Sequence, residues 1–193
     1  MSGTIHSLAD EVLSKQLEDE VQITFANKTD ATTGSLLFDL WKEKKLQPHQ
    51  CPQIEASGDM GWQGKGSGRS YTSLSGHAAL VASKTRKPVA KTMLAKCCSI
   101  CRSFYKRRPV EEQPPEHECV KNHDGSSGSM EPKAMVQMVV QLHRDHHVLV
   151  KTLITDDDSS VKAKAKWSNA DHMLNHGTTT KPTIMNSNGR EVE

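Results

Sequence analysis

The sequence predicts an α/β domain between about residues 51 and 175, and three observations support this. Two short apolar runs, GHAALVAS and PVAKTMLA, are joined by KTRK, which is a connection of hairpin length. The stretch SMEPKAMVQMVVQLHRDHH carries apolar residues at helical spacing, and the β-branched run VLVKTLIT follows it at once. A hairpin, a helix and a strand in this order are typical of a domain that packs helices against a sheet.

Composition limits both the size of the core and the cellular setting. Only 35% of the 193 residues are hydrophobic and 4% are aromatic, so a core along the whole chain is not expected. The net charge of +2 leaves room only for local basic patches. No stretch approaches the ~18 apolar residues of a membrane span, and the polar, acidic amino terminus is unlike a signal peptide. We therefore expect an intracellular protein with no membrane partner.

The two flanks differ from the predicted domain in composition. Residues 1–50 contain two helix-like pieces, SLADEVLSKQLEDEV and GSLLFDLWKEKK, between polar spacers. We interpret them as a peripheral N-terminal arm that is partly helical. Residues 176–193 are polar and lack apolar periodicity, so we expect a disordered tail.

Acidic residues stand where two predicted strands end. Asp59 follows QIEAS, and Asp156, Asp157 and Asp158 follow VLVKTLIT. Carboxylates that meet at adjacent strand ends can hold Mg²⁺ or Mn²⁺, which polarises a phosphodiester and activates the attacking group. The DDDSS run is also typical of a solvated turn or of a helix N-cap formed by Asp158 or Ser159. Spacing alone leaves these alternatives open.

A second group of candidate metal ligands lies in an insertion between the hairpin and the helix, at about residues 97–120. Two pairs of sulfur and nitrogen ligands can close around one structural Zn²⁺, with no open position for water. Cys97 can replace the first ligand in a shifted arrangement, and reduced thiols beside a surface histidine are the alternative without metal. The candidate zinc ligands are Cys98, Cys101, His117 and Cys119.

Basic residues occur close to both groups. Those in GKGSGRSYTS lie among glycines and those in RSFYKRRP lie beside aromatic residues, which suits contact with a DNA backbone. A flexible turn and a solvated basic loop are the alternatives. The candidate DNA contacts are Lys65, Arg69, Arg102, Lys106, Arg107 and Arg108.

Six motifs in a fixed order resemble one known family. They are DMGWQ with GSGRSYTSLSGHA, CCSIC, PPEHEC, KNHDGSSGSMEP, DDDSS and WSNADH. Together they resemble the Mutator-like transposase domain over roughly residues 54–175. The resemblance implies a ribonuclease H-like fold, a mixed sheet flanked by helices, with a zinc-binding insertion and a three-acid site that cuts and joins DNA. In that pattern Asp59 matches the first catalytic aspartate and Asp156 the second, with Asp158 as the alternative.

The chain also departs from the family pattern. Gly64 and Lys65 follow GWQ where the family usually has a basic pair, and the acid of a WSDxNH-like pattern is displaced to Asp171. The family's third acid is a glutamate further downstream, whereas only Glu191 and Glu193 follow Asp171 here. We therefore expect a partial domain in which the third acid is absent and catalysis is weak or lost.

Partners and compartment follow from the resemblance. It implies DNA as the partner, with transposon ends as the target of an active enzyme, and leaves homo-oligomerisation open. It also implies the nucleus, or the cytoplasm for a copy that has lost its function. The alternative function is a zinc-stabilised module that binds nucleic acid or protein and has no nuclease ancestry, in which the acids belong to surface turns.

Overall fold

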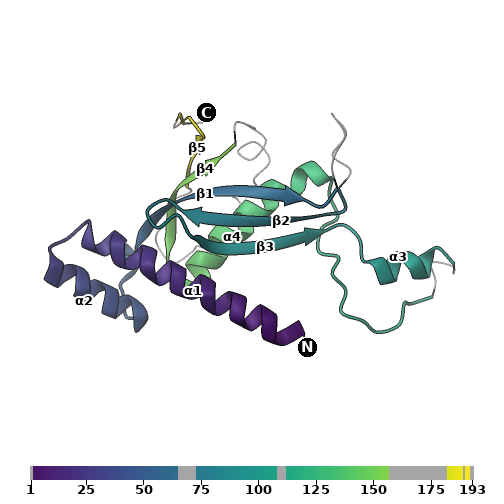
Figure 1. The fold of residues 1–193 in the computed structure, drawn as a ribbon, viewed down its shortest axis with the longest axis horizontal. Coiled ribbons are helices and arrows are strands. Elements are labelled where there is room, and N and C mark those ends of the chain that lie inside the picture. The colour runs from purple at the N-terminus through teal and green to yellow at the C-terminus, as the bar shows by residue number, and fades with distance from the viewer. Residues whose placement is uncertain (1, 65–72, 108–111, 157–181, 189, 192–193) are drawn as a thin grey trace.

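A computed structural model of the chain describes residues 2–64, 73–107, 112–156, 182–188 and 190–191 (Figure 1). The elements in chain order are α1 (Ser2–Ala26), α2 (Ala31–Lys42), the 3-10 helix η1 (Pro48–Gln50), β1 (Gln53–Trp62), β2 (Ser75–Ala82), β3 (Pro88–Ala95), α3 (Ser99–Tyr105), the 3-10 helix η2 (Ser127–Ser129), α4 (Met130–His146), β4 (Leu149–Thr155) and β5 (Thr183–Asn186). The predicted α/β class is confirmed.

The strands in the described residues form one five-stranded mixed sheet with the order β3-β2-β1-β4-β5. The pairs β1–β2 and β2–β3 are antiparallel, whereas β1–β4 and β4–β5 are parallel. The predicted hairpin corresponds to β2 and β3, the predicted helix to α4, and the strand that follows it to β4. These three predictions are confirmed.

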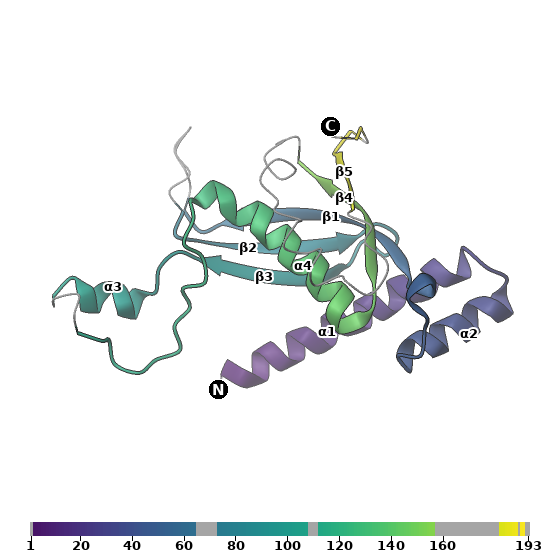
Figure 2. The same ribbon diagram turned by 180° about the vertical axis from the view of Figure 1, so that it is seen from behind.

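Helix α4 packs against one face of the sheet (Figure 2). Its apolar residues recur at helical spacing, which places them on the side that faces the strands. The contact is close at Gly58 of β1, where a Cβ atom would overlap Met135 Sδ and would lie 3.0 Å from Leu80 Cδ2. Glycine therefore lets the Met135 side chain of the helix lie directly against the strand. The buried α4 residues are Met130, Pro132, Ala134, Met135, Met138, Val139, Val140 and Leu142.

The N-terminal helices are part of the core, so the expectation of a peripheral arm is wrong, although the expected helices are present. Leu17, Val21 and Phe25 of α1 are buried in the main hydrophobic cluster. Glu20 has no exposed surface, and its carboxylate accepts the backbone N–H groups of Lys84 and Thr85 in the β2–β3 turn. Taken alone, the sequence of α1 is typical of a solvated arm. The burial of Glu20 could not be predicted from it, because the turn that binds this carboxylate lies 64 residues away along the chain.

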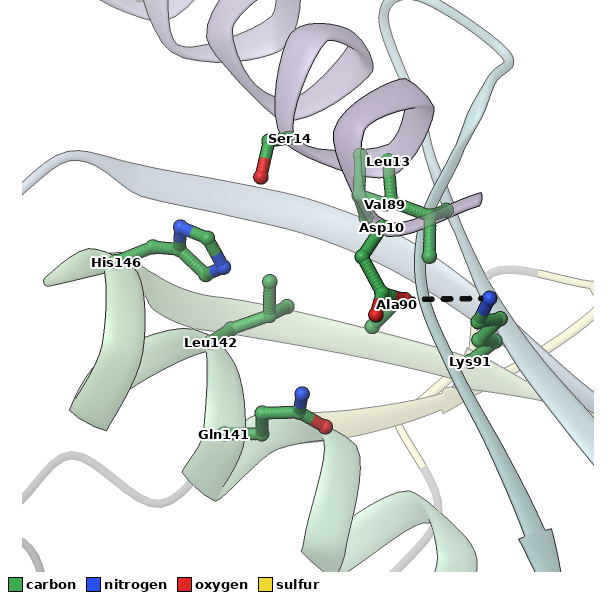
Figure 3. Close-up of a pocket in the computed structure, with 9 residues that line it drawn as sticks. All are labelled: Asp10, Leu13, Ser14, Val89, Ala90, Lys91, Gln141, Leu142 and His146. Atoms are coloured by element: carbon green, nitrogen blue, oxygen red, sulfur yellow. Dashed lines mark ion pairs between the residues drawn. The ribbon is translucent and has the colours of Figure 1, made fainter. Parts of the chain in front are cut away.

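Helix α1 runs alongside β3, and α2 connects it to the end of α4. Lys91 of β3 forms an ion pair with Asp10 of α1 at 3.3 Å, beside a cavity of about 250 Å³ that α4 also lines (Figure 3). Burial lowers the pKa of His146, another residue that lines this cavity. The Trp41 side chain of α2 donates a hydrogen bond to the His146 carbonyl at 2.7 Å. These contacts tie α1 to β3 and α2 to the C-terminal end of α4.

The insertion between β3 and α4 is held where β3 ends. The Asn122 amide accepts the Ala95 N–H at 2.8 Å and donates to the Met93 carbonyl at 2.9 Å. The backbone N–H of Asn122 also donates to the Ala95 carbonyl. In the same segment, His123 is buried and its Nε2 lies 3.0 Å from Ser129 Oγ at the start of α4. The KNHDGSSGSMEP motif therefore closes the loop and leads into the helix.

The described part of the C-terminal segment contains strand β5, so the expectation of a disordered tail is wrong there. Residues 183–186 pair with β4, and Ile184 is buried in the core cluster. A segment of four residues is too short to show periodicity, but the edge of β4 supplies hydrogen-bond partners for its backbone. Residues 176–181, 189, 192 and 193 lie outside the described residues. The domain boundaries themselves stay a prediction.

Removing the buried carboxylate of α1 should destabilise the fold. Glu20→Ala removes the acceptor of the partly buried N–H groups of Lys84 and Thr85, which we expect to cost about 1–3 kcal/mol in the free energy of unfolding. Glu20→Gln keeps one acceptor oxygen and should lose less. Denaturant unfolding measures both variants.

The control for this experiment is Glu18→Ala on the same helix. Glu18 is partly exposed and forms only a surface ion pair with Lys42 at 3.1 Å, so its loss should stay within about 0.5 kcal/mol. Equal losses for Glu18→Ala and Glu20→Ala would contradict the assigned role of the buried carboxylate.

Candidate functional site

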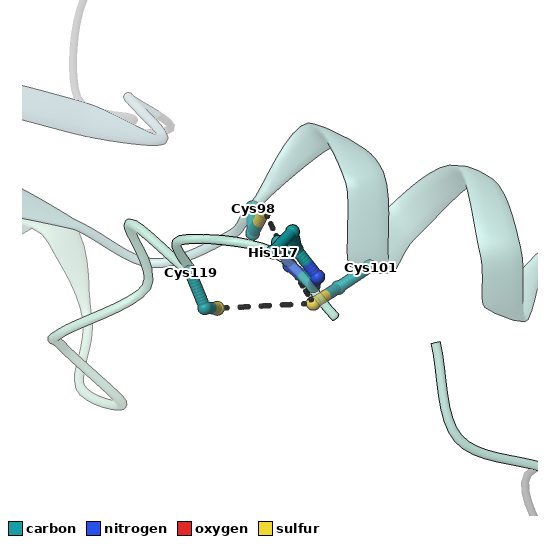
Figure 4. A group of neighbouring side chains, drawn as sticks. All are labelled: Cys98, Cys101, His117 and Cys119. Carbon is teal, nitrogen blue, oxygen red and sulfur yellow. Dashed lines mark hydrogen bonds between the residues drawn. The ribbon is translucent and has the colours of Figure 1, made fainter. Parts of the chain in front are cut away.

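The described residues contain one compact Cys/His cluster, and it lies in the insertion (Figure 4). Cys98 caps the short helix α3 and Cys101 lies in its first turn, so the two thiols are on one side of the helix. His117 and Cys119 come from the returning loop. The four ligand atoms all lie within 4.8 Å of one another. The structure thus brings together the four predicted zinc ligands, with Cys98 rather than Cys97 in the group.

The spacing of the four atoms fits a tetrahedral ion. His117 Nε2 lies 3.4 Å from Cys98 Sγ and 3.3 Å from Cys101 Sγ, and the Cys101 and Cys119 sulfurs are 3.8 Å apart. Zinc bonds of about 2.3 Å to sulfur and about 2.0 Å to nitrogen place tetrahedral ligand atoms roughly 3.5–3.8 Å apart. The cluster could therefore hold a metal ion such as zinc.

A backbone contact fixes the orientation of the histidine. His117 Nδ1 donates to the Pro115 carbonyl at 2.7 Å, which leaves Nε2 as the nitrogen that faces the thiols. This bond is the main cause that raises the pKa of His117, and the thiol of Cys98 contributes to the shift. An imidazole held in this way presents a lone pair to a metal ion, because the other nitrogen already carries the proton.

The pKa values of two thiols move in opposite directions. The backbone amide of Cys101 is the main cause that lowers the pKa of Cys98 to about 6. Burial, together with the neighbouring thiols of Cys119 and Cys98, raises the pKa of Cys101 to about 11. Thiolates that share one site repel each other unless a cation lies between them, and a bound divalent ion deprotonates its thiol ligands. This donor set is suited to zinc.

The second candidate site is a groove on the opposite face of the sheet from α4. Asp59 lies on the exposed side of β1, with Ser57 and Gly61, while Ile54, Ala56, Gly58 and Met60 face the core. The predicted strand end at Asp59 is wrong, because β1 continues to Trp62 through its pairing with β2. Asp59 is therefore a mid-strand residue, and its Oδ1 accepts the Met60 N–H at 2.7 Å.

The pairing of β1 with β4 brings Asp156 to the same groove. A bulge skips Lys151, so that Glu55 pairs with Thr152 and Ser57 with Ile154. The same register, continued by two residues, brings Asp59 level with Asp156, which directly follows β4. Both carboxylates line one groove of about 470 Å³. Its lining residues are Ser57, Gly58, Asp59, Gly61, His77, Ala79, Val81, Ile154, Thr155, Asp156 and Ser187.

The remaining basic and acidic residues that the sequence analysis named lie near α3, beside β5 or outside the described residues. Arg102, Lys106 and Arg107 are exposed on or just after α3. Glu191 is exposed and bridges to Met185 of β5. Lys65, Arg69, Arg108, Asp158 and Glu193 lie outside the described residues.

His77 and Ser187 are among the groove-lining residues that sequence reasoning missed. His77 alternates with Ala79 and Val81 on the exposed side of β2, and this period-2 pattern could have pointed to it. Ser187 directly follows β5, a strand that the sequence did not predict. No local pattern connects Ser187 to the acids.

Among the helices in the described residues, none is both long and apolar enough to cross a membrane. In comparison with known protein families, the family described as Mutator-like transposase matches residues 3–176 of the 193. No curated protein and no solved structure matches the chain. The matched region contains α1, the Cys/His cluster and both acids of the groove, and it covers most of the sequence. The chain therefore belongs to the Mutator-like transposase family.

Proposed function

We propose that this chain is a transposase-derived domain that binds DNA and holds Mg²⁺ or Mn²⁺ between Asp59 and Asp156. One observation carries the proposal: the two carboxylates come from neighbouring parallel strands and line one groove. Membership of a transposase family supplies the substrate class, because enzymes of this kind act on DNA phosphodiesters. The family also favours this function over a zinc-stabilised module without nuclease ancestry.

The proposed fold is ribonuclease H-like. The mixed sheet supports it, with an antiparallel hairpin on one side of β1 and parallel strands on the other. Helix α4 connects the two halves and leaves the groove on the other face of the sheet. In this arrangement Asp59 lies on β1 and Asp156 directly follows β4, the strand that pairs with β1.

The residues of the groove fit a hard divalent ion. Asp59 and Asp156 offer carboxylate oxygens, which Mg²⁺ and Mn²⁺ prefer, and substrate phosphate commonly completes such sites. A bound ion would polarise the phosphodiester and activate the attacking hydroxyl or water. Small residues beside the acids, Gly61 and Ala79, leave room for a DNA backbone.

Catalysis by the groove is proposed to be weak. Its described lining residues include two carboxylates, whereas the family pattern uses three acids. Glu191 pairs with β5 through its backbone. We propose that metal and DNA binding are retained and that efficient strand transfer requires a third carboxylate.

The zinc cluster is proposed to be structural and to present basic residues to DNA. Four protein ligands leave no position for water, so the ion would stabilise the insertion rather than react. Arg102, Lys106 and Arg107 are exposed on the helix that carries two of the ligands or just after it. Lys65, Arg69 and Arg108 remain predicted DNA contacts. DNA binding would place the protein in the nucleus, and assembly of copies on paired DNA ends would require a homo-oligomer.

Zinc should bind at the Cys/His cluster. We expect the purified chain to carry about one zinc ion, and the double variant Cys98→Ser, Cys101→Ser to lose it, because two of the four ligands are removed. Elemental analysis measures the metal. Cys97→Ser is the matched control, since Cys97 lies next to the cluster without belonging to it. Equal zinc in the wild type and in the double variant would contradict the assignment.

Mn²⁺ should bind at the acidic groove. Asp59→Asn and Asp156→Asn should each weaken Mn²⁺ binding by about tenfold or more, because each removes a charged oxygen ligand. Electron paramagnetic resonance of free Mn²⁺ measures the affinity, and zinc content checks that the fold is intact. Asp124→Asn is the control, since Asp124 pairs with Lys121 in the exposed loop after the cluster. An Asp124 variant as weak as the groove variants would overturn the assignment.

DNA binding should depend on the basic end of α3. Replacing Arg102, Lys106 and Arg107 with alanine should weaken binding and reduce the salt slope by about 0.9 for each phosphate that these side chains neutralise. Fluorescence anisotropy over a range of salt concentrations measures the slope. The double variant Lys44→Ala, Lys45→Ala, after α2, tests whether any surface charge has the same effect. If its slope falls as much, the α3 residues do not form the DNA-binding surface.

A further inference from the structure

His77 is the one titratable residue besides the two aspartates among the described residues that line the acidic groove. It lies on β2, on the same exposed side as Ala79 and Val81. In the pairing of β1 with β2, Asp59 is opposite Ala79 and His77 is opposite Gly61. His77 is thus the diagonal neighbour of Asp59, at a separation of roughly 7–8 Å, which is within reach of long side chains.

The surroundings of His77 leave its ring available to a ligand. Gly61, directly opposite, has no side chain, and a Cβ atom built there would meet only the His77 carbonyl oxygen, at 3.8 Å. Within the part of the chain that the structure describes, the ring forms no hydrogen bond or ion pair. A core histidine would be buried and would bond to the protein, as His123 does. His77 is exposed and does neither.

The chemistry of the groove favours a phosphate contact over metal ligation for His77. Among the described residues, only the Cys/His cluster groups three or more Cys, His, Asp or Glu ligands closely enough to hold one metal ion, so His77 and the two aspartates do not form such a group. Imidazole also suits zinc better than magnesium, whereas an imidazole N–H donates readily to a phosphate oxygen.

We propose that His77 is a further catalytic residue, which donates a hydrogen bond to a non-bridging oxygen of the DNA phosphodiester held at Asp59 and Asp156. The proposal rests on the proposed function of the acidic groove. Asp59 and Asp156 position the metal-bound side of the phosphate, and His77 contacts an oxygen on the β2 side. The three residues would together fix the orientation of one phosphate on an exposed sheet face, where the neighbouring side chains are small.

The test compares metal affinity with metal-dependent DNA affinity in the full chain. His77→Ala should leave Mn²⁺ binding within about twofold of the wild type and weaken DNA binding in Mg²⁺ by roughly 3- to 10-fold. DNA binding in EDTA should not change. His77→Gln retains an N–H donor and should recover part of the loss. His49→Ala, at an exposed histidine of η1, should behave as the wild type.

The magnetic resonance signals of the His77 ring distinguish a direct contact with DNA from a structural effect of the substitution. The ring signals of His77, assigned by their absence from the His77→Gln spectrum, should shift when a short DNA duplex is added with Mg²⁺. They should not shift with Mg²⁺ alone. An unchanged ring signal, or equal DNA affinity of His77→Ala and the wild type in Mg²⁺, would overturn the role of His77.

The remaining outcomes distinguish this inference from the proposed function. If Asp59→Asn loses Mg²⁺-dependent DNA binding while His77→Ala keeps it, the groove function stands and the His77 contact is wrong. If His77→Ala loses Mn²⁺ affinity as strongly as Asp59→Asn does, His77 is a metal ligand and the phosphate contact is wrong. If neither variant changes Mg²⁺-dependent DNA binding, both the groove function and the His77 contact are wrong.

Discussion

The register of β1 against β4 is the constraint on which the acidic groove depends. Side chains alternate between the two faces of a strand, so a slip by one residue would turn Asp59 from the exposed face toward α4. The bulge at Lys151 sets the remaining alignment, because without it Asp59 would be level with Thr155, which is buried, instead of Asp156. A parallel pair needs a crossover connection, and α4 provides it. The contact between Gly58 and Met135 then holds this helix close to the strand that carries Asp59.

The hairpin side of the sheet is stabilised by the N-terminal helices as well as by the pairing of its own strands. The buried carboxylate of Glu20 supplies acceptors for the β2–β3 turn, and burying such a group is tolerable only when its oxygens are hydrogen-bonded. Trp41 connects the same helical pair to the end of α4. Residues that the sequence assigns to a separate arm thus help to place β2, the strand that carries His77. This agrees with the start of the family match at residue 3.

Much of the fold is predictable because its signals are local. The hairpin, α4 and β4 each have a periodic pattern within one segment, and the Cys/His ligands are recognisable from residue type alone. The misses are long-range: the burial of Glu20 depends on a turn 64 residues away, and the four residues of β5 are ordered by the edge of β4. The glycines after Asp59 indicate a strand end, yet β2 extends β1 to Trp62. The bulge that aligns the acids leaves no sequence signal.

The two candidate metal sites differ in the type of their ligands and in their location on the domain. Four sulfur and nitrogen ligands gather in the insertion, where they would satisfy an ion completely and leave it inert. The carboxylates of Asp59 and Asp156 lie on the exposed sheet face, where the proposed metal site would leave coordination positions for a substrate. Asn122 joins the insertion to the end of β3, the strand next to β2. An ordered insertion therefore has a fixed attachment to the sheet, which would set the spacing between the basic residues of α3 and the acidic groove in the proposed complex with DNA.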